Sequence, residues 1–289
     1  MNFGEWLNTW YSLYVEPSAL APSTKAQYRR SINAVPLSLG NMPLSDLTSL
    51  DLQRWLVGVA RATPRAAQLD RVMLSRSLRI AGKLGLARPG LVDADLVPKV
   101  PHKPKEALVF TPEQAHSYLA AIKGSRCYVL LLLSLVCGLR RGEALGLRWQ
   151  DLDQTTGTLL IRRQRQRIDH QYETRPLKSQ SSRRALILPV EVIRILQQQP
   201  RPVTGWLVDA TPEQLRADHQ RALRTAELPA VTLHGLRHTM ATLAAAEGVP
   251  MKLLQVTLGH ATYKLTTDLY TKHFLPPSTT PSLVWQGIA

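Results

Sequence analysis

Cysteine is scarce in this sequence: only Cys127 and Cys137 occur, and both lie in one apolar segment. Two thiols cannot form a disulfide framework, and their surroundings are typical of a helix core. The N-terminus also lacks the basic stretch and following apolar stretch of a secretory signal. These absences argue against a disulfide-stabilised secreted protein, and we expect a reducing, cytoplasmic setting.

Long apolar runs are missing as well. The most apolar stretch extends from Tyr128 to Leu139, is bounded by Arg126 and Arg140, and is too short to span a bilayer. We predict a buried helix there. The sequence also has no low-complexity tract and no internal repeat.

Acidic residues are few beside basic ones. The chain has 36 Lys and Arg against 21 Asp and Glu, which gives a formal net charge of +15 and a pI of about 10.3. Both halves of the chain carry a basic excess. A protein this basic usually meets a polyanion, and DNA or RNA is the leading candidate. A membrane surface or a heparin-like polymer is the alternative.

The length of 289 residues suits one large domain or two moderate ones. Residues 86–110 are rich in proline and have no helical period, so we interpret them as an interdomain linker. Residues 1–85 then form a helical domain, and residues 111–289 form a domain of helices around a small sheet. The predicted fold class is mainly α, with a small antiparallel β-sheet in the C-terminal domain.

Apolar spacing predicts the helices of the first domain. Two of them are expected at about 49–60 and 63–84. A second helix opens near Pro22, with Ser23 or Thr24 as its N-cap. The first helix is expected to bury six side chains at spacings of three and four, namely Phe3, Trp6, Leu7, Trp10, Leu13 and Tyr14.

In the second domain, Thr111 begins a helix as its N-cap. Two strands are expected at 159–168 and 185–188, with a polar stretch between them. Three further helices are expected within 211–228, 232–248 and 250–260, because each has a start signal and an apolar period.

Four short segments of the second domain carry reactive side chains. They are Gly138-Leu139-Arg140-Arg141-Gly142-Glu143, Leu177-Lys178-Ser179, His234-Gly235-Leu236-Arg237-His238-Thr239, and Leu258-Gly259-His260 followed by Tyr270. Together their order, residue types and spacings resemble the catalytic set of the tyrosine recombinase (phage integrase) family. Residues 2–32 are similar to the core-binding domain of phage and transposon integrases.

The resemblance implies a site-specific DNA recombinase that cleaves and rejoins strands through a covalent 3′-phosphotyrosyl intermediate. Integration or excision of a mobile element is the expected role. The resemblance also implies a SAM-like core-binding domain and a catalytic domain that form a two-domain clamp on double-stranded DNA. A tetramer on DNA, a monomer when free, and an accessory DNA-bending or directionality factor are the expected partners, in the bacterial cytoplasm at the nucleoid.

The chemistry explains the residue types. A covalent protein–phosphate intermediate conserves the energy of the phosphodiester during strand exchange. A tyrosine hydroxyl has an ordinary pKa of ~10, so it needs a base or a strong positive field at neutral pH. The resemblance makes Tyr270 the nucleophile, with Tyr263 as its rival.

Arginine forks that are always protonated suit the charged oxygens of the transition state. The resemblance assigns this clamp to Arg140 and Arg237, with Arg141 as a rival to Arg140. Glu143 lies three residues after Arg140 and is expected to orient it. An ordinary surface ion pair is the alternative for Glu143.

The resemblance assigns proton transfer and further oxygen contacts to three other residues. Lys178 protonates the departing 5′-oxygen, although a solvated basic loop that contacts phosphates is the alternative. His234 acts as general base toward the tyrosine, and His260 donates a hydrogen bond to a nonbridging oxygen.

His234 and His238 have the spacing of a zinc pair, but Gly235 stands where a metalloprotease helix has glutamate. We therefore predict no metal and no cofactor, and a structural role for His238. Candidate DNA contacts outside the catalytic set are basic residues of both domains and the linker, namely Lys25, Arg29, Arg30, Arg76, Lys103, Arg141 and Arg183.

Several alternatives stay open. A Xer-like resolvase of chromosome or plasmid multimers, or a type IB topoisomerase-like enzyme, would share the chemistry. A DNA-binding protein without catalysis and an unrelated RNA-binding protein are the other classes. Many integrases carry an arm-binding domain before the core-binding pattern, which begins here near Phe3. That domain is expected to be missing, either naturally or by trimming. An apolar patch within 283–288 is expected to dock onto a neighbouring protomer.

Overall fold

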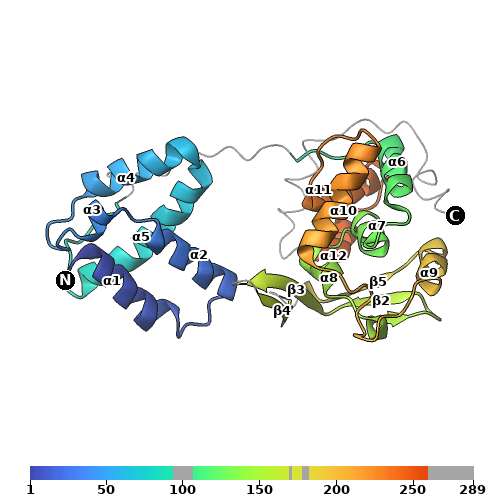
Figure 1. Ribbon diagram of the computed structural model, residues 1–289, viewed down its shortest axis with the longest axis horizontal. Helices are drawn as coiled ribbons and strands as arrows, with labels where there is room; N and C mark the ends of the chain where they lie inside the picture. The colour runs from blue at the N-terminus through green and yellow to red at the C-terminus, as the bar shows by residue number, and fades with distance from the viewer. Residues whose placement is uncertain (94–106, 169–170, 178–181, 260–289) are drawn as a thin grey trace. The chain divides into compact units, whose positions relative to one another are not determined.

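The computed structural model describes residues 1–93, 107–168, 171–177 and 182–259 (Figure 1). The chain divides into two compact units, Met1–Lys105 and Glu106–Ala289, which are described one at a time. The predicted fold class, mainly helical with small antiparallel sheet structure in the C-terminal part, is confirmed.

The first unit is helical throughout its described residues. Its elements are α1 (Phe3–Trp10), the π-helix η1 (Tyr11–Val15), α2 (Pro22–Asn33), α3 (Leu37–Gly40), α4 (Ser49–Ala62) and α5 (Pro64–Lys83). They enclose one apolar core to which each of them contributes buried side chains. The expected helices at 49–60 and 63–84 correspond to α4 and α5.

The first helix differs from its prediction in its last turn. Leu13 and Tyr14 are 64% and 42% exposed, whereas Tyr11 and Val15 are buried. The cause is the π-helical turn, in which the hydrogen bonds span five residues instead of four. The wider turn rotates the apolar stripe, so the spacing that predicted burial of Leu13 and Tyr14 no longer applies.

The start of α2 also differs from its prediction. Ala21 is the N-cap, Pro22 is the first helical residue, and no side chain caps this end. Ser23 and Thr24 therefore lie inside the helix. Proline suits this place because its fixed φ is already helical and its missing N–H would have been unpaired.

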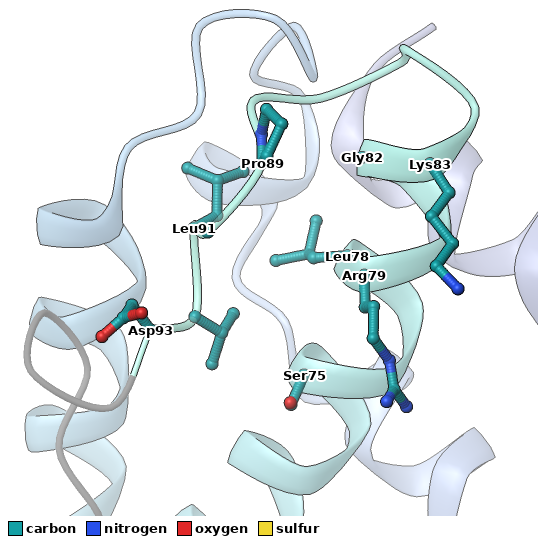
Figure 2. A pocket seen from close by; sticks show the side chains of 10 residues that line it. Ser75, Leu78, Arg79, Gly82, Lys83, Pro89, Leu91 and Asp93 are labelled. Carbon is teal, nitrogen blue, oxygen red and sulfur yellow. The ribbon is translucent and has the colours of Figure 1, made fainter.

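A cavity of about 410 Å³ lies between the end of α5 and the following turn. Figure 2 shows Leu78 of α5 and Leu91 of the turn beside it, with the charged ends of Arg79 and Lys83 on the helix. Its described lining holds no cluster of nucleophilic or acid–base side chains. The reactive segments that the sequence predicts lie instead in the second unit.

The second unit is built around α7 (Tyr128–Val136), whose residues from Val129 to Leu135 are all buried. The predicted helix at 128–139 thus ends three residues early. Gly138 lies in the turn that follows. The other helices are α6 (Pro112–Ile122), α8 (Arg141–Leu145), the 3-10 helix η2 (Trp149–Asp151), α9 (Val190–Gln197), α10 (Pro212–Thr225), α11 (Leu233–Ala246) and α12 (Met251–Leu258). Among the described helices, none combines the length and the apolar character needed to cross a membrane.

Two antiparallel sheets accompany these helices. The first has the order β1 (Leu152–Asp153), β2 (Thr158–Ile161), β5 (Arg184–Ile187). The second is a hairpin of β3 (Arg163–Ile168) and β4 (Gln171–Pro176), which Figure 1 shows as a separate ribbon. The single strand predicted at 159–168 is therefore two strands, and the prediction missed β4. Its sequence QYETRP has no apolar face to reveal it.

Aromatic and ionic contacts stabilise this polar hairpin instead of an apolar core. The Arg165 guanidinium lies 5.4 Å from the ring centroid of Tyr172 and 4.9 Å from that of Trp206. Glu213, in the first turn of α10, accepts hydrogen bonds from Tyr172 (2.7 Å) and Arg167 (2.9 Å). The hairpin is thereby fixed to the segment that leads into α10.

The hairpin also packs closely on α8. A Cβ added at Gly146 would lie 3.0 Å from the carbonyl oxygen of Arg163 and 3.0 Å from Cα of Gln164. Any larger side chain would push β3 away from α8. This close approach fixes the hairpin relative to the helix that follows Arg140.

Candidate active site

The turn between α7 and α8 brings three of the four predicted segments together. Gly138 has φ +63°, a conformation that residues with a Cβ rarely adopt. A Cβ there would also clash with side-chain atoms of Met240 on α11 and Leu258 on α12. The absence of a side chain thus allows the backbone before Arg140 to touch both helices.

Arg237 joins the same three segments through hydrogen bonds. Its side chain is buried on the inner face of α11, and the residue is only 2% exposed. Nη1 donates to the carbonyl oxygen of Gly138 (2.7 Å), and Nη2 donates to that of Leu258 (2.5 Å). The guanidinium is therefore held between the α7–α8 turn and the end of α12.

Arg140 contacts the backbone carbonyl that follows that of Leu258. Its Nη2 donates to Gly259 (3.2 Å), which ends α12 in a left-handed conformation as the predicted Leu-Gly turn requires. The side chain remains 36% exposed. Both arginines thus contact backbone directly before His260, and Arg140 offers its guanidinium to solvent.

Glu143 fixes Arg140 in two ways. Its Oε1 lies 2.7 Å from Nη1 of Arg140, and its Oε2 accepts the backbone N–H of Arg140 at 3.0 Å. Glu143 is only 2% exposed, so the alternative of an ordinary surface ion pair is wrong. The carboxylate caps the start of α8 while it holds the side chain that precedes the helix.

Arg184 is a second partner of Glu143 that sequence reasoning missed. Its Nη2 lies 2.9 Å from Oε2 of Glu143, and its side chain is 4% exposed. The sequence places Arg184 beside Lys178, and nothing in its pattern signals a partner forty-one residues away. Burial raises the pKa of Glu143, but the hydrogen bond and charge of Arg184, with those of Arg140, hold the pKa below its usual value.

His234 lies in the first turn of α11, three residues before Arg237. Thr232 caps this turn by accepting the N–H of Gly235 at 2.9 Å. Loss of water around the ring lowers the pKa of His234, and the charges of Arg237 and Arg140 lower that pKa further, against the opposing effect of Glu143. The imidazole is consequently neutral at pH 7 and able to accept a proton.

The lowered pKa of His234 leads to a prediction for the pH dependence. A base must be neutral, and the neutral form persists down to a pH below the ordinary histidine pKa of ~6.5. We expect the single-turnover rate constant for strand cleavage to stay level from pH 8 to about 6.5 and to fall only below that. Quench experiments across this range measure it. A fall that begins near pH 7.5 and is lost in His234→Gln would contradict the prediction.

Buried hydrogen bonds anchor the segment that leads into α11. His219 of α10 donates from Nε2 to the carbonyl oxygen of Val231 (2.9 Å), which leaves Nδ1 to accept the Tyr118 hydroxyl (2.7 Å). Sequence reasoning did not single out these two residues. They fix the backbone one residue before the Thr232 cap and so help to place His234.

His238 contacts His234 edge to face, with ring centroids 4.6 Å apart. Within the ranges the structure describes, His, Cys, Asp and Glu side chains nowhere gather in a group of three that would hold a metal ion. The histidine pair therefore has no third ligand among the described residues.

An open groove of about 890 Å³ adjoins the cluster. It lies along α10 and the start of α11, and its lining includes Arg141, Arg216, Arg224, Thr232 and His234. Three arginines and one glutamate, Glu227, lie among its otherwise neutral or apolar lining, so the groove has a basic excess beside His234.

The candidate DNA contacts of the second unit, Arg141 and Arg183, are exposed. In the first unit, Arg29 lies over the ring of Tyr11 at 3.6 Å. Lys25 donates to the carbonyl oxygen of Glu16 at 2.6 Å. Arg30 and Arg76 are exposed on α2 and α5. Outside the described residues lie Lys103, Lys178, His260, Tyr263 and Tyr270, together with the apolar patch within 283–288.

Two regions of the chain match known protein families. Residues 109–275 match the phage integrase family, and residues 2–58 match the N-terminal SAM-like domain of phage integrases. A XerC-like tyrosine recombinase of Caldanaerobacter subterraneus is 25% identical over 97% of this chain and 81% of its own length. An integrase of Streptomyces ambofaciens is 26% identical over 86% of this chain and 71% of its own.

Solved structures share the fold. The Tn1549 transposon integrase in complex with circular intermediate DNA superimposes with a TM-score of 0.79 at 21% identity, over 93% of this chain and 95% of that one. A lambda integrase dimer bound to a core site gives 0.73 at 19% identity, over the same shares. The family match covers more than half of the chain, and the fold agrees with it. The chain therefore belongs to the phage integrase family and is a tyrosine recombinase, an enzyme that breaks and rejoins DNA strands.

Proposed function

We propose that this recombinase integrates or excises a mobile element by cutting double-stranded DNA at specific sites with Tyr270. The observation that carries the proposal is the convergence of Arg140, Arg237 and His234. The two guanidiniums bond to backbone carbonyls at the end of α12, and His234 precedes Arg237 by about one turn of α11. A charged clamp beside a neutral imidazole is the arrangement that phosphodiester cleavage by tyrosine needs.

In the proposed first step, the Tyr270 oxygen attacks the scissile phosphorus and its proton passes to His234. The bond from phosphorus to the 5′-oxygen breaks, and Lys178 gives that oxygen a proton. Arg140, Arg237 and His260 stabilise the nonbridging oxygens. In the second step a 5′-hydroxyl attacks the phosphotyrosine, so both proton transfers run in reverse and the tyrosine is released.

The proposed organisation follows from the same assignment. Residues 1–85 are the core-binding domain, 86–110 the linker and 111–289 the catalytic domain. The two domains clamp the duplex, with Lys25, Arg29, Arg30, Arg76, Lys103, Arg141 and Arg183 on its phosphates. A lambda integrase structure is described as a tetramer bound to a Holliday junction, which supports a tetramer here. Two free, buried cysteines suit the cytoplasm as its compartment.

A second candidate role is Xer-like resolution of DNA multimers. The XerC-like recombinase is similar over 97% of this chain, which favours this role as the second candidate. The two roles share every chemical step and differ in the DNA that carries the site. The sequence of the cleaved site therefore distinguishes the two roles. A mobile element supplies two different ends, whereas a resolution site is one locus that occurs once in each copy of the multimer.

Covalent capture from DNA tests the proposed chemistry. The test uses duplexes of random sequence that carry scattered nicks. Cleavage near a nick releases a short fragment with a free 5′-hydroxyl, which diffuses away. Religation is then prevented, and the enzyme stays covalently linked to its site. We expect a 3′-linked adduct, a recovered site sequence and, after proteolysis, a nucleotide on the peptide that contains Tyr270. An adduct on any other residue, or capture of a 5′ end, would overturn the proposal.

A further inference from the structure

Glu143 is shared by two arginines that differ sharply in exposure. Oε1 lies 2.7 Å from Nη1 of Arg140, and Oε2 lies 2.9 Å from Nη2 of Arg184. Nη1 of Arg184 also lies 3.3 Å from Oε1. The Arg140 side chain is 36% exposed, whereas that of Arg184 is 4% exposed. Of these two arginines, Arg140 is therefore the one that solvent reaches.

The charges of this cluster explain why two arginines are present. A buried carboxylate paired with Arg140 alone would cancel the positive charge that the clamp requires, because opposite charges this close neutralise each other's field. Arg184 supplies a second positive charge inside the protein. The three groups then sum to one net positive charge, and Arg140 carries it at the surface.

Arg184 is itself held away from solvent. Its Nη1 donates to the carbonyl oxygen of Ser182 at 3.0 Å, and β5 begins at Arg184 next to β2. Its guanidinium charge is paired with the Glu143 carboxylate at 2.9 Å, so we assign Arg184 to Glu143 and not to DNA. The neighbouring Arg183 is exposed and remains the candidate phosphate contact.

We propose that Arg184 is a positioning residue that neutralises Glu143, so that Arg140 keeps an uncompensated positive charge for the scissile phosphate. The proposal rests on the proposed function, because it presumes that Arg140 binds that phosphate. Cleavage would then depend on a buried counter-charge, Arg184, that lies outside the four catalytic segments.

Single-turnover cleavage of nicked site DNA by Arg184→Met and Arg184→Lys tests the proposal. Methionine keeps an apolar stem and removes the charge, whereas lysine keeps the charge. We expect Arg184→Met to cleave ~10- to 100-fold more slowly with DNA affinity within about threefold of wild type, and Arg184→Lys to retain most of the rate. Equal loss in both variants, or a loss of affinity that accounts for the rate, would overturn it.

A neutral substrate separates charge from structure. A methylphosphonate at the scissile position removes the nonbridging negative charge, so a weaker positive field should matter less. We expect the rate loss of Arg184→Met relative to wild type to be at least about tenfold smaller on this substrate than on the phosphate. We also expect its acid limb of cleavage to move to higher pH, since an uncompensated Glu143 raises the pKa of His234. A defect of the same size on both substrates would show a structural role only.

A double variant keeps the test decisive if Arg184→Met folds poorly. Glu143→Gln combined with Arg184→Met removes a neutral pair and leaves the charge of Arg140 in place. We expect its ratio of phosphate to methylphosphonate cleavage rates to match the wild-type ratio, because the net charge of the cluster is unchanged. A lower phosphate-to-methylphosphonate ratio, which the loss of a positive charge would give, would refute the proposal. If wild type forms no adduct at Tyr270, the proposed function fails instead.

Discussion

Tyr270→Phe is expected to form no covalent adduct with a nicked DNA site and to lower the cleavage rate constant at least ~10⁴-fold. The substitution removes one oxygen, the atom that would attack phosphorus, and leaves the ring. The substitution changes no charge of the cationic cluster around Arg140 and Arg237, so DNA binding should persist. Gel separation of adducts, with filter binding on the same DNA, measures both quantities.

Tyr263→Phe is the matched control for this prediction. It makes the same chemical change seven residues earlier, and we expect its adduct yield to stay close to wild type. An adduct that persists in Tyr270→Phe and disappears in Tyr263→Phe would transfer the nucleophile to Tyr263. Loss in both variants, with DNA binding intact, would leave the assignment to peptide mapping.

Arg237→Lys is expected to lower the cleavage rate constant ~10³-fold although it keeps a positive charge. The planar fork of Arg237 reaches the carbonyl oxygens of Gly138 and Leu258 at 2.7 and 2.5 Å. An ammonium cannot take up that fork geometry. The α7–α8 turn and the end of α12 would then lose their common partner, and an active-site displacement of about 1 Å costs ~10²-fold in rate.

Arg221→Lys provides the control for a conservative change at an arginine. Arg221 lies on α10 with a 65% exposed side chain and pairs with Asp218 at 3.0 Å. We expect a rate within about twofold of wild type, because exposed ion pairs contribute little. Quench kinetics and thermal unfolding should be recorded for both variants. Cleavage by folded Arg237→Lys within tenfold of wild type would contradict the prediction.

Local patterns were enough to predict part of the site. The spacing of His234 and Arg237 within a helix that starts at a threonine cap is a short-range signal, and α11 has that form. The Leu-Gly turn at the end of α12 was visible for the same reason, because a left-handed helix end favours glycine. Such features depend on residues three or four apart.

The features that sequence reasoning missed depend on distant residues. Glu143 of α8 and Arg184 of β5 meet across forty-one residues of chain, and His219 of α10 meets Val231 across twelve. β4 was invisible because its partner is an equally polar strand. The hairpin contacts Glu213 and Trp206 through Arg165 and Arg167 of β3 and Tyr172 of β4. Neither propensity nor period encodes such pairings.

The π-helical turn at Tyr11–Val15 changes how insertions and deletions near the N-terminus should be interpreted. A π-turn is equivalent to an α-helix with one extra residue, so a relative that lacks one residue here would have a regular helix and an unchanged loop. In this chain, deletion of one residue within Tyr11–Val15 should likewise close the turn to a regular α-helix and keep the direction of the segment that follows. Glu16, whose carbonyl oxygen accepts Lys25, would then stay in place. A one-residue gap in an alignment at this place therefore marks a change of helical winding and not a displacement of the basic face of α2.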